Sequence, residues 1–332
     1  MENSIIIAGE RIAQGTQKEV RLKISEFYTA YPVYIPVIVT HGVEEGPALF
    51  VTAAIHGDEI NGIEIVRRLV TKINPKELRG TVLCVPVVNI FGFYTMSRNL
   101  PDRRDLNDAF PGIQKGSPAS RVAYILFEEI IKKCDYGIDI HTPQVKRIEI
   151  PHTEADLSNR DAHQLARAFG TPVVINTAGP EKSLQNSAAS ADIPTIVFSG
   201  GEVLRFHENV TEQGVDGIHN VLAYLNMIEF EISKPEYSII VQESRSVQTQ
   251  QGGILCVNVN PGGLVYQGDL IARVTNPFGR DVELIKAPET GLIISASTNP
   301  LVNPGNEVCA YVMLDKSLGI VEEALRNRKQ TE

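Results

Sequence analysis

A continuous apolar run at residues 48–55 that leads directly into a helical pattern constrains the fold more than any other feature of the chain. The run has the composition of a buried strand, and apolar residues then recur at helical spacing over residues 60–73. Strand-like and helix-like segments alternate in this way as far as residue 232. This alternation predicts an α/β fold with a mostly parallel or mixed sheet and helices on both faces.

Other segments of the chain show the same two patterns. Strands are expected at 20–24, 34–39, 48–54, 81–88, 136–140, 173–175 and 195–198, and helices at 60–73, 119–133, 157–169 and 207–227. The segment from 89 to about 118 has neither pattern and is expected to be a long loop. Such loops are uncommon in compact domains and are often functional.

The pattern changes after residue 232, where short strand-like runs are separated by Gly and Pro. This change predicts a small all-β module. At 332 residues the chain is long for a single domain. We therefore expect an α/β domain at residues 1–232, a β domain at 235–320 and a C-terminal tail at 321–332.

Composition and charge limit the expected binding partners and the expected cellular location of the protein. The net charge is −9 and no basic run stands out, so nucleic acid is not an expected partner. The chain shows neither a signal peptide nor an apolar run that would span a bilayer, so no membrane is expected. Its four cysteines form no CxxC pair and are expected to be reduced thiols, which favours a cytoplasmic protein.

Two strand ends carry side chains that suit a metal. His56 follows the apolar run, and Glu59 stands at the start of the next helical pattern. His141 ends a second strand-like run, and ligands of open α/β sheets bind at the carboxyl ends of strands. A catalytic zinc takes three such ligands, so His56, Glu59 and His141 are the expected set. The alternative is an ordinary strand-end histidine beside a glutamate that is favoured by the helix dipole.

Three blocks of the sequence resemble the aspartoacylase/succinylglutamate desuccinylase family of zinc hydrolases, which are relatives of the zinc carboxypeptidases. They are Ile-His-Gly-Asp-Glu at 55–59 after Gly-Pro at 46–47, the segment 89–98 with 105–107 and 110–112, and Ile-Asp-Ile-His at 138–141. The segment after residue 235 resembles the barrel-sandwich domain that ends this family and is related to lipoyl and biotinyl carriers. It lacks the lysine-bearing hairpin tip of a carrier.

The resemblance implies roles for individual residues. His56, Glu59 and His141 would hold Zn²⁺, which supplies a nucleophilic water near neutral pH. Arg98 would stabilise the oxyanion that develops on the scissile carbonyl, and Asn107 would orient the substrate. Asp139 is either a partner for the outer nitrogen of a ligating histidine or a buried, satisfied carboxylate.

Two positions depart from the family pattern. The family carries an arginine that grips a substrate carboxylate where this chain has Asp108. A carboxylate there would repel an acidic substrate, which favours a neutral or cationic one. Asn107 and Asp108 could also be simple turn formers.

The second departure concerns the general base. The resemblance places a glutamate on a late strand at the position that Ser199 occupies here, and Glu202 is the next acid along the chain. A serine is not a base near neutral pH, so either Glu202 reaches the water from the glycine-rich turn at 200–201 or hydrolysis is impaired. The structural alternative for Glu202 is a pair with Arg205.

These observations together predict a zinc-dependent hydrolase that cleaves the amide bond of a small N-acylated amino acid or amine. One alternative is a catalytically impaired metal-binding homologue that recognises a ligand or a partner protein. Another is an esterase that uses the same site. The expected partner is a small N-acyl substrate, and the sequence leaves a homo-oligomer open.

Overall fold

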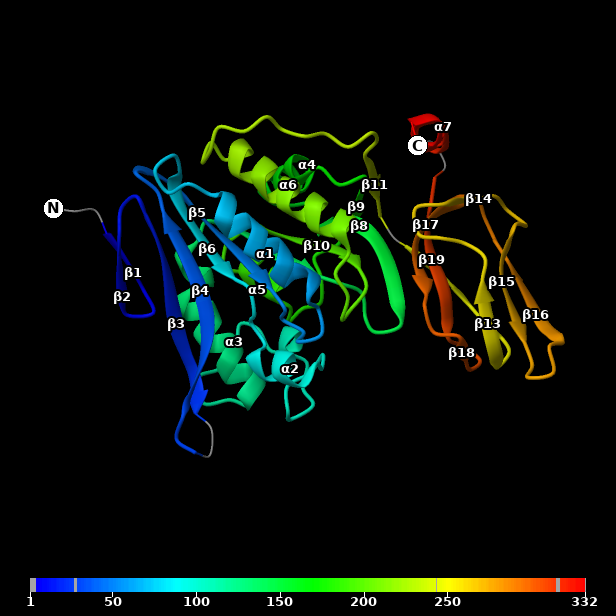
Figure 1. The fold of residues 1–332 in the computed structure, drawn as a ribbon, viewed down its shortest axis with the longest axis horizontal. Helices are drawn as coiled ribbons and strands as arrows, with labels where there is room; N and C mark the ends of the chain where they lie inside the picture. The colour runs from blue at the N-terminus through cyan, green and yellow to red at the C-terminus, as the bar shows by residue number, and fades with distance from the viewer. Residues whose placement is uncertain (1–3, 27–28, 243, 315–316, 332) are drawn as a thin grey trace.

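The computed structural model describes residues 4–26, 29–242, 244–314 and 317–331, and it confirms the predicted α/β architecture. Over this part of the chain a 13-stranded mixed sheet forms the centre of the molecule (Figure 1). Its main path runs through β12 (Arg245–Gln248), β19 (Glu307–Met313), β17 (Gly291–Ser297), β8 (Arg147–Ala155), β10 (Thr195–Gly201), β7 (Tyr136–His141), β5 (Glu44–Ala53), β6 (Arg79–Val85), β4 (Pro32–His41) and β3 (Thr16–Glu26).

The centre of this sheet is parallel and its flanks are antiparallel. β10, β7, β5 and β6 run parallel to one another, whereas β8 joins β10, and β4 joins β6, in the antiparallel sense. The remaining strands of this sheet are β9 (Val173–Asn176), β11 (Ile239–Val241) and β14 (Leu264–Val265). β1 (Ser4–Ile7) and β2 (Glu10–Ala13) form a separate hairpin.

Helices cover both faces of the sheet, which explains why residues 48–55 are apolar apart from Thr52, whose buried hydroxyl donates to Asp139. Leu49 and Val51 of β5 pack in one buried cluster with helices α1 (Asn61–Lys72), α4 (Arg160–Phe169) and α6 (Glu208–Tyr224). Phe50 points to the opposite face and packs in a cluster with α3 (Pro118–Glu129) and α5 (Leu184–Ala189). Successive side chains of a strand alternate between faces, so a strand that is buried on both sides needs apolar residues at every position.

The segment from 89 to 118, expected to be a loop without regular structure, contains short helical elements. They are α2 (Ile90–Thr95) and the 3-10 turn η1 (Leu106–Asp108). Asn89 caps α2, because its side-chain oxygen accepts a hydrogen bond from the Gly92 N–H at 2.8 Å. An asparagine side chain that satisfies a free amide in this way starts a helix that is too short to show an apolar period. A second 3-10 turn, η2 (Ile131–Lys133), follows α3.

The C-terminal β region is joined to the α/β sheet through paired strands. β17 pairs with β8, and β11 pairs with β9. A smaller four-stranded sheet is formed by β16 (Asp281–Lys286), β15 (Leu270–Thr275), β13 (Gly253–Val257) and β18 (Leu301–Val302). Residues 321–331 of the expected tail fall within helix α7 (Leu318–Thr331), whose Val321 is buried, and residue 332 lies outside the described residues. Within the described ranges, no helix is both long enough and apolar enough to cross a membrane.

Gly137 tests how closely the central strands are packed. It lies opposite Phe50 in the β5–β7 pair, and a Cβ atom at this position would come within 2.0 Å of the phenylalanine ring. The Gly137→Ala variant is therefore expected to lose about 1–3 kcal/mol of unfolding free energy through overpacking. Gly319→Ala in α7 is the matched control, because no atom lies within 4 Å of the added Cβ. Urea denaturation followed by circular dichroism measures both, and equal stability of Gly137→Ala and the parent would contradict the prediction.

Candidate metal centre

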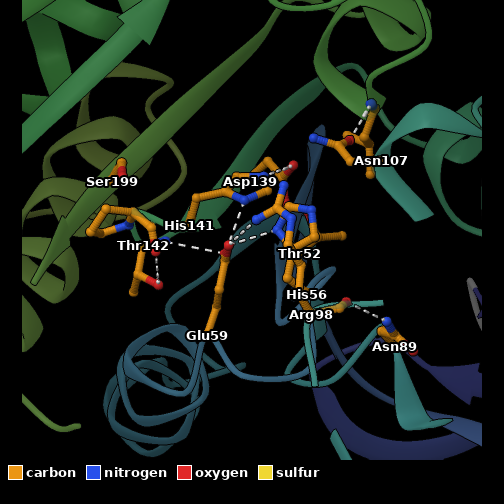
Figure 2. A network of polar contacts seen from close by, with 12 residues as sticks. Thr52, His56, Glu59, Asn89, Arg98, Asn107, Asp139, His141, Thr142 and Ser199 are labelled. Carbon is orange, nitrogen blue, oxygen red and sulfur yellow. Dashed lines mark hydrogen bonds and ion pairs between the residues drawn. The ribbon is translucent and has the colours of Figure 1, made fainter. Parts of the chain in front are cut away.

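The pairing of two parallel strands brings the predicted ligands together. β5 and β7 are hydrogen-bonded neighbours with Ala53 opposite Ile140, so their carboxyl ends meet at one edge of the sheet. His141 is the last residue of β7, and His56 lies in the turn that follows β5. Glu59 immediately precedes α1 and turns back toward both strands (Figure 2).

Glu59 lies between the two imidazoles. Its Oε1 atom is 2.6 Å from Nδ1 of His56, and its Oε2 atom is 3.0 Å from Nδ1 of His141. The Thr142 backbone N–H donates a further hydrogen bond to Oε2 at 3.1 Å. One ligand atom from each of His56, Glu59 and His141 lies within 4.8 Å of the others, a spacing that one metal ion could bridge.

A carboxylate contacts the outer nitrogen of each histidine. Nε2 of His56 is 2.9 Å from Asp105 Oδ1, and Nε2 of His141 is 2.8 Å from Asp139 Oδ2. The Thr52 hydroxyl donates to the other oxygen of Asp139 at 2.7 Å. A carboxylate at Nε2 holds the proton there and leaves the Nδ1 lone pair directed at the centre, as in carboxylate–histidine–metal arrangements.

The charges of the cluster also fit a divalent cation. Burial would raise the pKa of the Glu59 carboxyl, but the two imidazoles outweigh it and lower this pKa to about 2. Burial would likewise lower the pKa of His56, yet the Glu59 and Asp105 carboxylates raise it. Arg98 pairs with Glu59 and Asp105, whereas Asp139 contacts His141, and a divalent cation between the imidazoles would balance the remaining negative charge of these three carboxylates.

Arg98 reaches the centre from the segment after α2. Its Nε is 3.0 Å from Oδ2 of Asp105, and its Nη1 is 3.4 Å from Oε1 of Glu59. Asn89 holds this segment by donating its side-chain N–H to the Arg98 carbonyl at 3.2 Å. The guanidinium is therefore positioned beside the three predicted ligands (Figure 2).

Asn107 lies farther from the ligands but on the same cavity. Its side-chain oxygen accepts a hydrogen bond from the Leu184 N–H at 2.9 Å, which links η1 to the start of α5. Its own backbone N–H donates to Asp105 at 2.9 Å. The structure thus brings His56, Glu59, His141, Arg98 and Asn107 to a single cavity of about 470 Å³.

The structure places two other predicted site residues elsewhere. Asp108 is exposed in η1 and does not line the cavity. Glu202 is also absent from the lining: its Oε1 accepts a hydrogen bond from the Thr298 hydroxyl at 2.8 Å, and its Oε2 is 3.5 Å from Nε of Arg205. The glycines before Glu202 form a bulge in β10, and this geometry does not direct the side chain to the centre.

The far wall of the cavity carries two carboxylates to which the sequence analysis assigned no role. Glu149 and Glu154 both lie on β8 and line the cavity together with Ser199 of β10. Oε1 of Glu154 is 3.4 Å from Nε2 of His152, whereas Glu149 accepts a hydrogen bond from the Ser199 hydroxyl at 3.3 Å. The sequence offered one signal for these residues. Three ionisable side chains, Glu149, His152 and Glu154, are close together in a segment that forms a strand with neighbours on both sides, where such side chains are seldom buried.

Known proteins resemble this chain in sequence over most of its length. Residues 45–225 match the model of the succinylglutamate desuccinylase/aspartoacylase catalytic domain. A curated relative, the N-alpha-acetyl-L-2,4-diaminobutyric acid deacetylase of Halomonas elongata, is 28% identical over 318 residues. The match covers 90% of this chain and 92% of that protein. The range matched by the family model, residues 45–225, contains the described residues that line the cavity.

Solved structures share the whole fold. The product-bound ectoine utilization protein EutE (DoeB) from Ruegeria pomeroyi superimposes with a TM-score of 0.80 at 21% identity, over 90% of this chain and 95% of that one. A succinylglutamate desuccinylase/aspartoacylase from Rhodobacter sphaeroides gives a TM-score of 0.78 at 23% identity, over 89% and 94%. These likenesses extend through the C-terminal β region as well as the α/β sheet.

Asp139 tests the role of the outer carboxylates. Asp139→Asn removes the charge that orients His141, so affinity for a divalent cation is expected to fall roughly 10- to 100-fold. Thr52→Val keeps the carboxylate and removes one of its hydrogen bonds, so a smaller loss is expected. Asp192→Asn, at an exposed turn, is the control. Competition with a chromogenic chelator measures all three, and unchanged affinity in Asp139→Asn would contradict the assignment.

Proposed function

Because the chain belongs to the succinylglutamate desuccinylase/aspartoacylase family, we propose that it is a zinc-dependent deacylase acting on a small N-acylated amino acid or amine. One observation carries the proposal. His56 and Glu59 lie in the connection between β5 and α1, and His141 lies 82 residues beyond Glu59 at the end of β7, yet their ligand atoms lie within 4.8 Å of one another beside a cavity. Two imidazoles and one carboxylate form a common ligand set of hydrolytic zinc.

The residues around the cavity have separate tasks in this proposal. Zinc, when bound, would supply a Lewis acid for the scissile carbonyl and for water. The Arg98 guanidinium, held by Asp105 and Asn89, would donate hydrogen bonds to the carbonyl oxygen as negative charge develops there. Asn107 on the cavity wall would orient the substrate. Because these donors are already in place, little reorganisation would be needed during the reaction.

The cavity favours a substrate with few carboxylates. The arginines among its described lining residues are Arg98, which pairs with Asp105 at 2.9 Å, and Arg147, which pairs with Glu307 at 3.0 Å. Each guanidinium already has a carboxylate partner, so a substrate carboxylate would compete with that partner for it. We therefore propose a neutral or cationic amine half, in line with the diaminobutyric acid derivative that the curated relative is named for. Asp108 is exposed, so the paired arginines rather than repulsion by Asp108 support this preference.

A second candidate function is a binding protein that has lost hydrolysis. The observation in its favour is Ser199, which occupies the strand position where the family resemblance implies a general base. An esterase would use the same cavity and differs only in the bond that is cleaved. A substrate panel separates the three. It contains N-alpha-acetyl-2,4-diaminobutyrate, N-acetylaspartate, N-succinylglutamate and matched esters, each tested with and without a chelator.

Metal content is the first test of the deacylase. About one zinc per chain is expected by atomic emission, with loss in His56→Ala and in His141→Ala, since each removes one of three ligands. Chelation should abolish hydrolysis of the preferred amide, and added zinc should restore it. The exposed Asp192→Asn variant serves again as the control. Full hydrolysis by metal-free protein, or an intact metal content in both histidine variants, would refute the proposal.

Arg98 tests oxyanion stabilisation separately from metal binding. Arg98→Ala is expected to lower kcat roughly 10²- to 10³-fold, because its hydrogen bonds strengthen only as charge develops. Arg98→Lys keeps the positive charge but lacks the planar guanidinium group with its paired N–H donors, so it should recover part of the rate. Zinc content is measured on the same samples. A variant with normal kcat and raised KM would assign Arg98 to substrate binding instead.

A further inference from the structure

Hydrolysis of an amide needs a group that takes a proton from water and returns one to the leaving nitrogen, which is otherwise a poor leaving group. The cavity holds few groups that can exchange protons. Among the described lining residues the carboxylates and histidines are His56, Glu59, Asp139, His141, Glu149 and Glu154. His152 contacts Glu154 and is considered with them. The first four form the candidate metal centre, which leaves the groups on β8.

Glu154 and His152 are engaged with each other. Nε2 of His152 is 3.4 Å from Oε1 of Glu154, and its Nδ1 is 3.0 Å from the Ile150 carbonyl oxygen. Burial would lower the pKa of His152, but the hydrogen bond to Glu154 and the nearby carboxylates raise it to about 9. Each ring nitrogen of His152 thus contacts an oxygen acceptor, and Glu154 is the carboxylate paired with the ring.

Glu149 is less constrained than the other cavity carboxylates. Within the described part of the chain its one hydrogen bond comes from the neutral Ser199 hydroxyl, at 3.3 Å. It lies opposite Gly201 on one side and Ser295 on the other, next to the β10 bulge between Ser199 and Gly201. At that bulge the glycines present no side chains between Glu149 and the cavity.

Ser199 connects Glu149 to the candidate metal centre. In the parallel β10–β7 pair Ser199 lies opposite His141, so the two side chains share a face of the sheet. Figure 2 shows Ser199 on the side of His141 away from Arg98. The Glu149 carboxylate, which accepts a hydrogen bond from Ser199, therefore lines the same cavity as His141, with Ser199 on the strand between them.

We propose that Glu149, on β8, is the general base and then the general acid of this deacylase, in the place that Ser199 leaves vacant on β10. The inference rests on the proposed function. Its carboxylate accepts a proton from the attacking water as the new C–O bond forms at the carbonyl carbon. It then gives that proton to the amide nitrogen as the C–N bond breaks, so the products are a carboxylic acid and an amine. Glu149 ends as the carboxylate with which it began.

The environment of Glu149 suits this task. Burial raises the pKa of the Glu149 carboxyl above its usual value, and the nearby Glu154 carboxylate adds to this. Together they outweigh the His152 and Arg147 charges and the Ser199 hydrogen bond, which lower it. A carboxylate with a raised pKa is a stronger base, and a pKa closer to the working pH lets the same group take up the proton and release it in the return step. Below this pKa the group is protonated and is no longer a base, so kcat/KM should fall on the acid side of the profile.

The test is Glu149→Gln, which keeps the size of the side chain and removes its basicity. We expect kcat to fall roughly 10²- to 10⁴-fold, with zinc content and the calorimetric Kd for substrate unchanged. The acid limb of the kcat/KM profile should disappear from the residual rate. Metal-free protein offers an independent readout, because the infrared band of a protonated carboxyl should titrate above the usual glutamate range and be missing in Glu149→Gln.

Two further variants sharpen the result. Glu202→Gln decides between the two carboxylates, since full activity there excludes Glu202 as the base and a large loss in kcat would overturn the assignment to Glu149. The Glu149→Gln/Ser199→Glu double variant returns a carboxylate to the neighbouring strand, and at least a tenfold recovery over Glu149→Gln is expected.

Other results would overturn the inference in distinguishable ways. A Glu149→Gln protein with parental kcat shows that the base lies elsewhere while the deacylase stands. Raised KM with unchanged kcat makes Glu149 a binding residue, and lost zinc or lost fold makes it structural. A zinc-loaded parent protein that cleaves no member of the panel removes the proposed function and this inference with it.

Discussion

The buried Glu59 carboxylate is the constraint on which the rest of the site depends. A charge inside a protein is costly unless it is paired and hydrogen-bonded, and Glu59 is 1% exposed. His56, His141 and the Thr142 N–H supply that pairing, and each comes from the end of a parallel strand or the turn beyond it. The histidines in turn require carboxylates at their outer nitrogens. The need to satisfy one carboxylate therefore organises a cluster that extends to α2 and η1.

Much of this arrangement could be predicted from sequence, because it follows from local pattern and parallel topology. A strand segment with successive apolar residues, such as 48–51 of β5, is expected to be covered on both faces, and the structure covers both faces of it. Parallel neighbours place their carboxyl ends together, so His56 and His141 could be expected to meet although they are distant in the chain. The family resemblance then supplied Arg98 and Asn107, which have no period or spacing of their own. The structure brings both to the same cavity.

The rest depends on contacts between segments that no local pattern encodes. Glu202 follows the late strand in sequence, yet the β10 bulge leaves it beside Thr298 and Arg205. Glu149 lies far from that strand in sequence and reaches the cavity because β8 pairs antiparallel with β10. Antiparallel register is set by bulges and by side-chain packing, which apolar periodicity does not report. A comparison of sequence motifs also expects the general base on the same strand as in the family. It therefore does not consider a carboxylate on the neighbouring strand.

Two neighbouring strands of a sheet can place a side chain at the same point in space. A chemical group can therefore keep its place in a site although its position in the sequence differs. The strand neighbour of His141 carries a hydroxyl at Ser199, and the next strand brings the Glu149 carboxylate within hydrogen-bond distance of that hydroxyl. A reaction requires a group at a point in space, and adjacent strands about 4.8 Å apart can both direct a side chain to it. A hydroxyl in the place of a carboxylate therefore does not by itself mark a decayed site. The inference of lost activity has to be drawn from the whole cavity wall, and here that wall includes β8.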